Sequence, residues 1–237
     1  MVIDILTLFP SMFDGFLNNS IIKRAIENDK IKINIHNIRD YSPYKNKQVD
    51  DYPIGGGSGM VLMCEPIFNA IEDLRKDNTE VIMLTPGGQT FNQKMAKELS
   101  KLSHIILLCG HYEGFDERIK TIIDREVSIG DFVLTGGELP AMMISDAITR
   151  LVPGVISDGS LDSESFDTEL LDYPNYTKPV DFRGMKVPEI LLSGHHENIK
   201  KWRLEQQIIK TKERRPDLLE KSEEYEKWAI CFSKKKF

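Results

Sequence analysis

Apolar positions in the first two thirds of the chain follow two alternating patterns, one typical of strands and one typical of helices. Continuous or alternating apolar runs predict strands at Val2–Leu8, Lys32–Ile38, Glu80–Leu84 and Ile105–Cys109. Apolar spacings of three and four residues predict helices at Ser20–Glu27, Glu65–Lys76, Asn92–Lys101 and Glu138–Leu151. Strands that alternate with helices predict an α/β domain with a largely parallel sheet.

The pattern changes after residue 151. Residues 152–182 are rich in Asp, Ser, Thr and Pro and have no sustained period, which indicates either a flexible linker or a functional loop. Helical spacing returns at His195–Lys212 and Leu218–Ile230. We therefore expect an α/β domain over residues 1–155, a flexible interdomain loop over 156–185 and a small all-α C-terminal domain over 186–237.

Composition favours a protein of a soluble, reducing compartment. The 237 residues are 41% hydrophobic, enough to bury a sizeable core. The three cysteines, Cys64, Cys109 and Cys231, form no CxxC pair, which argues against a disulfide framework and a structural zinc site. The chain starts directly with a strand-like run rather than a signal peptide, and no apolar run approaches membrane-spanning length. We expect a cytoplasmic protein.

The net charge of −6 hides an asymmetry along the chain. Residues 1–185 carry 18 Lys and Arg against 28 Asp and Glu, whereas residues 186–237 carry 13 against 9. Within 200–215 there are seven basic and only two acidic residues. Such a local basic stripe is what contact with nucleic-acid phosphates requires, although a solvated helix face has the same composition.

Glycines gather where predicted strands end. Eleven of the sixteen glycines fall between Gly55 and Gly137, in loops that include 86–88, 110–114 and 129–138. Glycine permits positive φ and close approach of the backbone to a ligand, and open α/β sheets bind ligands at these strand ends. Several such loops together predict a pocket that holds a nucleoside by backbone groups, whereas any one alone could be a tight turn. No GxGxxG or GxxxxGK[ST] motif occurs, which argues against NAD binding and P-loop hydrolysis.

Longer motifs carry a resemblance to a known family. They are Val49-Asp50-Asp51 with the glycine-rich run 55–60, and the runs 110–118, 128–141, 170–179, 193–196 and 201–203. Together they resemble the bacterial tRNA (guanine-N1)-methyltransferases of the TrmD family, essentially along the whole chain. The resemblance implies a SPOUT-class α/β fold with a deep trefoil knot, and an obligate homodimer with a composite active site. It also implies methyl transfer from S-adenosyl-L-methionine to N1 of the guanosine 3′ of the tRNA anticodon, where that guanosine follows another.

The resemblance places the cofactor by position. The residues implied to bind it are Thr85, Pro86, Gly110, Tyr112, Glu113, Gly114, Ser128, Ile129, Gly130, Asp131, Phe132, Val133, Leu134, Gly136, Gly137 and Pro140. This set agrees with the pocket expected from the glycines. The run 129–134 is apolar enough to form a buried strand, but the glycines within and after it favour a ligand-binding loop.

The resemblance also implies contacts with tRNA. The residues are Asp50, Gly55, Gly56, Gly59, His111, Ser165, His195, His196 and Arg203. Position 111 often holds arginine in the family, so a contact from His111 should be weaker and more dependent on pH. His195 and His196 should open the C-terminal helix near the RNA, with simple helix capping as the alternative. The same analogy allows magnesium to support turnover, although the sequence contains no cluster at metal-ligand spacing.

Methylation of guanine N1 needs a base for the N1 proton and a cation for the charge that develops on O6. The family analogy points to Arg150 as the cation and to the acidic residue before Ser165-Phe166, here Glu164, as the base. The family pattern has aspartate at that position, so Asp162 and Asp167 remain alternatives to Glu164. If these residues are not catalytic, the acidic residues belong to a solvated loop and Arg150 is a cation stabilised at a helix C-terminus.

Two other functions remain open from the sequence. One is a SPOUT methyltransferase that acts on ribosomal RNA or on a ribose hydroxyl. The other is an RNA-binding module that has lost its chemistry, for which glutamate in place of aspartate at position 164 is the only indication. The complete set of cofactor loops argues against the second.

Overall fold

The computed structural model describes residues 1–157, 165–166, 170–222 and 225. The chain divides into two compact units, residues 1–156 and residues 157–237. Among the described residues, no helix combines the length and apolar character needed to cross a membrane.

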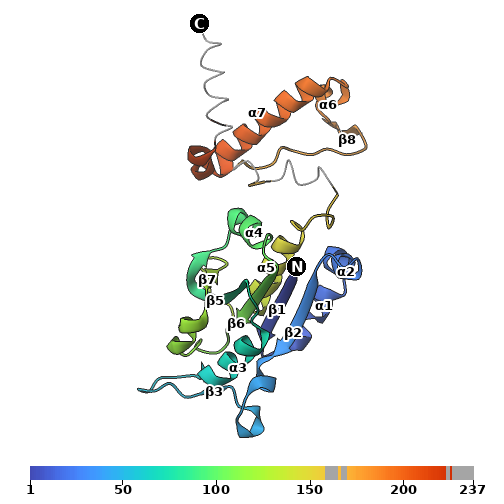
Figure 1. The fold of residues 1–237 in the computed structure, drawn as a ribbon. Helices are drawn as coiled ribbons and strands as arrows, with labels where there is room; N and C mark the ends of the chain where they lie inside the picture. The colour runs from blue at the N-terminus through green and yellow to red at the C-terminus, as the bar shows by residue number, and fades with distance from the viewer. Residues whose placement is uncertain (158–164, 167–169, 223–224, 226–237) are drawn as a thin grey trace. The chain divides into compact units, whose positions relative to one another are not determined.

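The first unit is built on a five-stranded sheet with the order β2-β1-β6-β5-β7 (Figure 1). Its strands are β1 (Val2–Thr7), β2 (Lys32–Asn37), β5 (Thr79–Thr90), β6 (His104–Cys109) and β7 (Arg125–Ser128). Every neighbouring pair in this sheet is parallel. The central strand β6 is buried at every residue, as expected for a strand with helices on both faces. The predicted α/β unit with a largely parallel sheet is therefore confirmed.

Alternate residues of the strands feed two cores, because successive side chains of a strand point to opposite faces. On one face Ile3, Ile5 and Leu107 pack with residues of three helices, α2 (Ser20–Glu27), α4 (Gln93–Leu99) and α5 (Glu138–Thr149). On the other face Leu6, Ile106 and Leu108 pack with residues of α3 (Cys64–Leu74), η2 (Ile38–Tyr41) and η4 (Glu117–Ile122).

Short elements complete the first unit. They are η1 (Pro10–Phe13), α1 (Asp14–Leu17), η3 (Lys45–Lys47), β3 (Asp50–Asp51) and β4 (Val61–Leu62). Strands β3 and β4 pair antiparallel, so the glycine-rich run between them forms the loop of a hairpin.

A polar network lies on the α3 side of the sheet. Asp4 is 3% exposed, and its Oδ1 accepts a 2.6 Å hydrogen bond from Asn34 Nδ2. His36 Nε2 lies 3.0 Å from the same oxygen, and His104 Nε2 lies 2.7 Å from Oδ2. Burial alone would raise the pKa of Asp4, but the hydrogen bonds from His36, Asn34 and His104 outweigh it and hold that pKa well below its usual value. The ionised carboxyl is thus a stabilised part of the core.

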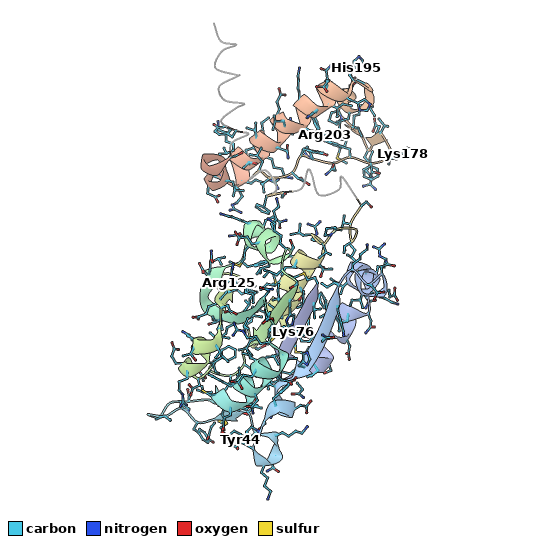
Figure 2. The ribbon with its side chains drawn as sticks, in the orientation of Figure 1. Tyr44, Lys76, Arg125, Lys178, His195 and Arg203 are labelled. Carbon is cyan, nitrogen blue, oxygen red and sulfur yellow. The ribbon has the colours of Figure 1, made fainter. Side chains whose placement is uncertain are left out.

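Strand β7 is the one strand of this five-stranded sheet that the apolar pattern does not predict. Its sequence Arg-Glu-Val-Ser contains a single apolar residue, and it lies at the edge of the sheet. Arg125, which is labelled in Figure 2, pairs with Glu80 of β5 at 2.7 Å and with Glu98 of α4 at 3.6 Å, so ion pairs cover the start of β7, whereas its last two residues are buried. Strand β5 bends where its register with β7 shifts between Leu84 and Gln89.

The second unit contains α6 (Glu189–Leu192), the long helix α7 (His196–Arg214) and η5 (Pro216–Lys221). It also contains a short hairpin, β8 (Asp181–Phe182) with β9 (Met185–Lys186), so it is not built of helices alone. Leu170 is fully buried against Ile208 and Leu219. Described residues of the expected loop 156–185 therefore pack within this unit. Most of the expected helix Leu218–Ile230 lies outside the described residues.

Candidate active site

A cavity of about 330 Å³ opens at the carboxyl ends of β5, β6 and β7. Three loops form its wall: the bend of β5 at Thr85 and Pro86, the loop 110–115 after β6, and the loop 128–137 between β7 and α5. The carboxyl ends of parallel strands meet at one edge of a sheet, which brings these loops together. The size of the cavity lies in the range of small-molecule and cofactor sites.

Glycines permit the close approach of the loops that form the cavity. A methyl group on Gly137 would lie 2.7 Å from Cys109 Cα and 2.8 Å from Gly110 N, both of which are backbone atoms. Gly137 N donates a 2.8 Å hydrogen bond to the Gly110 carbonyl oxygen. No residue with a side chain could occupy position 137 without moving the end of β6 away from the start of α5.

One wall of the cavity presents apolar side chains to solvent. Phe132, Val133 and Leu134 all line the cavity, and Val133 is 85% exposed. The run 129–134 is therefore an exposed loop, and the alternative of a buried strand is wrong. Tyr112 also lines the cavity, with a positive φ of 58° that non-glycine residues rarely adopt. Such a backbone conformation is retained where the surrounding structure holds it, often at a functional site.

The glycine-rich loop between β3 and β4 reaches the rim of the cavity. Glu113 N donates a 3.0 Å hydrogen bond to the Met60 carbonyl, and Leu62 N donates a 2.9 Å hydrogen bond to the Gly114 carbonyl. A methyl group on Gly59 would lie 2.5 Å from Glu113 Cγ. The glycine at position 59 thus allows the Glu113 side chain to lie directly against this loop.

An ion pair anchors the far end of the loop after β6. Arg118 Nε and a terminal nitrogen donate to the two carboxyl oxygens of Asp116 at 2.9 and 2.7 Å. These hydrogen bonds hold the pKa of Asp116 well below its usual value. Asp116 Oδ1 also accepts from Arg118 N at the start of η4. The pair fixes the point at which the cavity loop joins the helical turn.

His111 carries a buried nitrogen with no hydrogen-bond partner. His111 lines the cavity, and its Nδ1 is enclosed yet unpaired. A buried polar atom without a hydrogen-bond partner is costly in a native structure. The ring is held by edge contacts with Phe9 and Tyr112, at centroid distances of 4.9 and 4.8 Å.

Neither described cysteine is suited to act as a nucleophile. Burial, with the charge of Glu138, raises the pKa of the Cys109 thiol well above its usual value. Burial, with the neighbouring Asp116, likewise raises the pKa of Cys64. Both thiols stay protonated near neutral pH, whereas covalent catalysis needs the thiolate.

The second unit has a cavity of its own, which offers cationic and aromatic side chains. It encloses about 390 Å³ between residues 173–180 and helices α6 and α7. The Arg203 guanidinium lies over the Tyr173 ring at 4.6 Å from its centroid, a cation–π contact (Figure 2). His195 precedes α7 without a side-chain cap, and its Nδ1 lies 3.0 Å from the Ser193 carbonyl. His195 thus occupies the N-cap position and opens α7 as predicted, but its side chain does not cap the helix amides.

The chain was compared with models of known families. A model described as tRNA (Guanine-1)-methyltransferase TrmD matches residues 1–221. The chain belongs to this family. Two relatives from this family are identical to this chain at more than half of the aligned residues. A tRNA (guanine-N(1)-)-methyltransferase of Dictyoglomus turgidum (strain DSM 6724 / Z-1310) is 58% identical over 221 residues, 93% of this chain and 90% of the relative. One of Staphylococcus aureus (strain JH9) is 57% identical over 224 residues, 93% of this chain and 91% of the relative.

The structure brings most of the TrmD-family motif residues together. Of the residues predicted to bind cofactor, all but Asp131 line the first cavity. Further lining residues that the sequence did not single out are Leu84, Phe115, Val127 and Thr135. Leu84 and Val127 each lie immediately before a predicted cofactor residue, Thr85 and Ser128, so their place in the sequence was the signal that could have identified them.

The remaining predicted residues of the TrmD-family motifs fall in several places. Gly55, Gly56 and Gly59 have positive φ in the β3–β4 loop, and Asp50 lies in β3. Arg150 follows the last residue of α5, and Ser165 Oγ accepts a 2.9 Å hydrogen bond from Asp172 N. His196 is the first residue of α7 and is exposed. Glu164, with Asp162 and Asp167, lies outside the described residues.

Proposed function

We propose that the protein is a tRNA (guanine-N1)-methyltransferase that uses S-adenosyl-L-methionine and acts on the guanosine immediately 3′ of the anticodon. The observation that carries the proposal is the cavity at the strand ends, because family-motif residues from three separate loops surround it. The names of the relatives supply the substrate and the atom that is methylated.

The residues present fit S-adenosyl-L-methionine. The glycines at positions 110, 136 and 137 carry no side chain, so an adenosine moiety can approach the backbone of the cavity wall closely there. Phe132, Val133 and Leu134 offer an apolar wall for its adenine ring. When bound, the cofactor supplies an electrophilic methyl group on a sulfonium centre.

Methyl transfer requires that the protein accept the proton of guanine N1 and stabilise the negative charge that develops on O6. As the bond from guanine N1 to the methyl carbon forms and the sulfur–methyl bond breaks, N1 loses its proton. We assign Glu164 as the base that accepts this proton, and Arg150 as the cation that stabilises negative charge on O6. Asp162 and Asp167 are the alternatives to Glu164. Arg150→Lys should lower turnover, because an ammonium cannot reproduce the planar guanidinium fork.

Recognition of tRNA is assigned to both units. In the first unit, the β3–β4 loop and His111 border the cavity where the guanine must enter. In the second unit, Arg203, His195 and His196 lie on or beside α7, which carries the basic stripe. Phosphate contacts of this kind orient an RNA without reading its sequence.

We propose that the enzyme acts as a homodimer with a composite active site, as the family resemblance implies. Large apolar side chains that remain exposed support this assignment: Phe9 and Met12 at η1, and Leu139 and Met143 one turn apart on α5. Exposed apolar groups on neighbouring elements commonly mark a protein interface. Light scattering should give twice the chain mass for the wild type and a smaller mass for Met143→Lys.

We also propose that the first unit contains a deep trefoil knot, as the family resemblance implies. We assign the protein to the cytoplasm, where tRNA is available. The chain path supports the knot. Residues 85–90 fold over β7, with Gly88 against the backbone of Glu126 and Val127. After β7 the chain returns past β5 to Gly110 before α5 begins.

The family analogy also allows magnesium to support turnover, although none of these steps is assigned to it. Within the part of the chain that the structure describes, no group of three or more His, Cys, Asp or Glu side chains could hold a metal ion.

The proposal is tested by incubation of the protein with methyl-labelled S-adenosyl-L-methionine and a tRNA transcript, followed by nucleoside analysis. We expect 1-methylguanosine. A 2′-O-methylated nucleoside would place the protein among ribose methyltransferases instead, and failure to bind the cofactor would favour an RNA-binding module without chemistry.

A further inference from the structure

Two buried polar side chains lie directly behind the cavity without forming part of its wall. Thr7 ends β1 and is fully buried, and Glu138 begins α5 and is 2% exposed. Thr7 Oγ1 donates a 2.8 Å hydrogen bond to Glu138 Oε1. The same hydroxyl oxygen accepts a 2.9 Å hydrogen bond from Phe9 N. The threonine therefore links the start of α5 to the chain that follows β1.

This linkage continues through side-chain contacts to the cavity. The Phe9 ring meets the His111 ring edge-on at 4.9 Å, and His111 meets Tyr112 in the same way at 4.8 Å. His111 and Tyr112 both line the cavity. A continuous series of contacts thus runs from Glu138 through Thr7 and Phe9 to the cavity wall.

Glu138 also approaches His111 across the backbone of Gly136. A methyl group on Gly136 would lie 2.3 Å from Glu138 Oε2 and 2.8 Å from His111 Nδ1. The carboxylate and the imidazole therefore flank the same point of the cavity loop. Because the buried Thr7 and Glu138 side chains have few alternative positions, we expect a change at either one to shift the neighbouring His111 ring.

We propose that Thr7 and Glu138 are positioning residues of the cofactor cavity: they set the places of His111 and Tyr112 and so raise the affinity for S-adenosyl-L-methionine without touching it. The inference rests on the proposed function, since it takes this cofactor as the ligand. The competing explanation is purely structural, because an acidic residue at the N-terminus of a helix is stabilising wherever it occurs. In that case changes at Thr7 or Glu138 would alter stability but not affinity.

The test compares Thr7→Val with Thr7→Ser. Valine keeps the shape of threonine but removes the hydroxyl, whereas serine keeps the hydroxyl. Titration calorimetry with S-adenosyl-L-methionine alone measures affinity independently of turnover. We expect Thr7→Val to weaken binding by about tenfold and Thr7→Ser to bind nearly as the wild type does.

Thr79→Val is the matched control. Thr79 is a buried threonine of β5, whose Oγ1 accepts a 2.8 Å hydrogen bond from Lys76 N and lies 2.7 Å from His104 Nδ1. It does not line the cavity. Thr79→Val removes this hydroxyl, which should lower the melting temperature as much as Thr7→Val does and leave the affinity for the cofactor unchanged.

Phe9→Leu keeps the test decisive if Thr7→Val fails to fold. Phe9 is 39% exposed, so the substitution spares the core, and leucine keeps an apolar side chain at this point of the proposed dimer interface. It should weaken cofactor binding by about fivefold through loss of the ring contact with His111. If both variants fold, the double variant should lose less affinity than the two single changes predict together, since they act along one series of contacts.

Wild-type affinity in Thr7→Val and Phe9→Leu, with a lower melting temperature alone, would overturn the inference and leave the proposed function intact. Absence of binding to the wild-type protein would instead overturn the proposed function, so the two failures are distinguishable.

Discussion

The Gly137 amide donates a 2.8 Å hydrogen bond to the carbonyl oxygen of Gly110, and this bond ties the first turn of α5 to the end of β6. The two residues are far apart in sequence, yet each belongs to a loop that lines the cavity. The close contact fixes the distance between two of the three cavity loops.

Gly137→Ala should lower both stability and cofactor affinity. The new methyl group would meet backbone atoms of Cys109 and Gly110, which cannot rotate away. Overpacking of this kind costs about 1–3 kcal/mol in the free energy of unfolding, measurable by urea denaturation. Gly87→Ala is the control, because a methyl group there has no atom within 4 Å and should leave stability and cofactor binding near wild-type values. Equal behaviour of the two variants would contradict the account.

Gly59→Ala should impair methyl transfer more than Gly56→Ala. Both glycines have a positive φ, so alanine brings similar backbone strain to each. They differ in surroundings: a methyl group on Gly59 would meet the Glu113 side chain at 2.5 Å, whereas one on Gly56 meets nothing within 4 Å. The comparison therefore isolates displacement of Glu113 from strain in the loop. Steady-state kcat/KM of the two variants decides it, and equal losses would leave the Gly59–Glu113 contact without a role.

Glu164→Gln should lower turnover by roughly a hundredfold or more, since general-base catalysis contributes about that much. Affinity for tRNA and for the cofactor should stay unchanged, because glutamine keeps the size of the side chain. Single-turnover rates at saturating tRNA measure the effect. Asp162→Asn and Asp167→Asn are the matched controls on the same segment. If one of them loses turnover and Glu164→Gln does not, that aspartate is the base.

Asp4 should make stability depend on pH in the acid range. Its pKa in the folded protein is depressed, so its contribution is fully present above the unfolded-state pKa of about 4 and is lost as the pH falls below that value. At pH 7, Asp4→Asn should cost about 2 kcal/mol through the charge-assisted hydrogen bonds that it removes. Urea denaturation from pH 5 to pH 3 should show the wild-type advantage shrinking, and a constant difference across that range would refute the assignment.

The sequence predicts the buried strands of the first unit better than it predicts the edge strand β7. Continuous apolar runs identify β1 and β6 because these strands are buried on both faces. Strand β7 escapes detection because Arg125 pairs with Glu80 and Glu98 at the edge of the sheet. Because charged residues take part in these ion pairs, β7 lacks the apolar alternation from which a strand is predicted.

The sequence likewise predicts only part of the candidate site. Glycines at strand ends predict that a cavity exists, since the geometry of a parallel sheet brings such loops together. Contacts between loops are not encoded by any local pattern. The approach of Gly59 to Glu113 and the bond from Thr7 to Glu138 join residues far apart in sequence, so both become visible only in the folded chain.

The most direct test of the central claim uses two tRNA transcripts that differ only in the nucleotide 3′ of the anticodon, guanosine in one and adenosine in the other. Labelled S-adenosyl-L-methionine supplies the methyl group, and the products are digested to nucleosides and identified. We expect 1-methylguanosine from the first transcript and no labelled product from the second. Equal labelling of both transcripts, or a methyl group on a ribose hydroxyl, would contradict it.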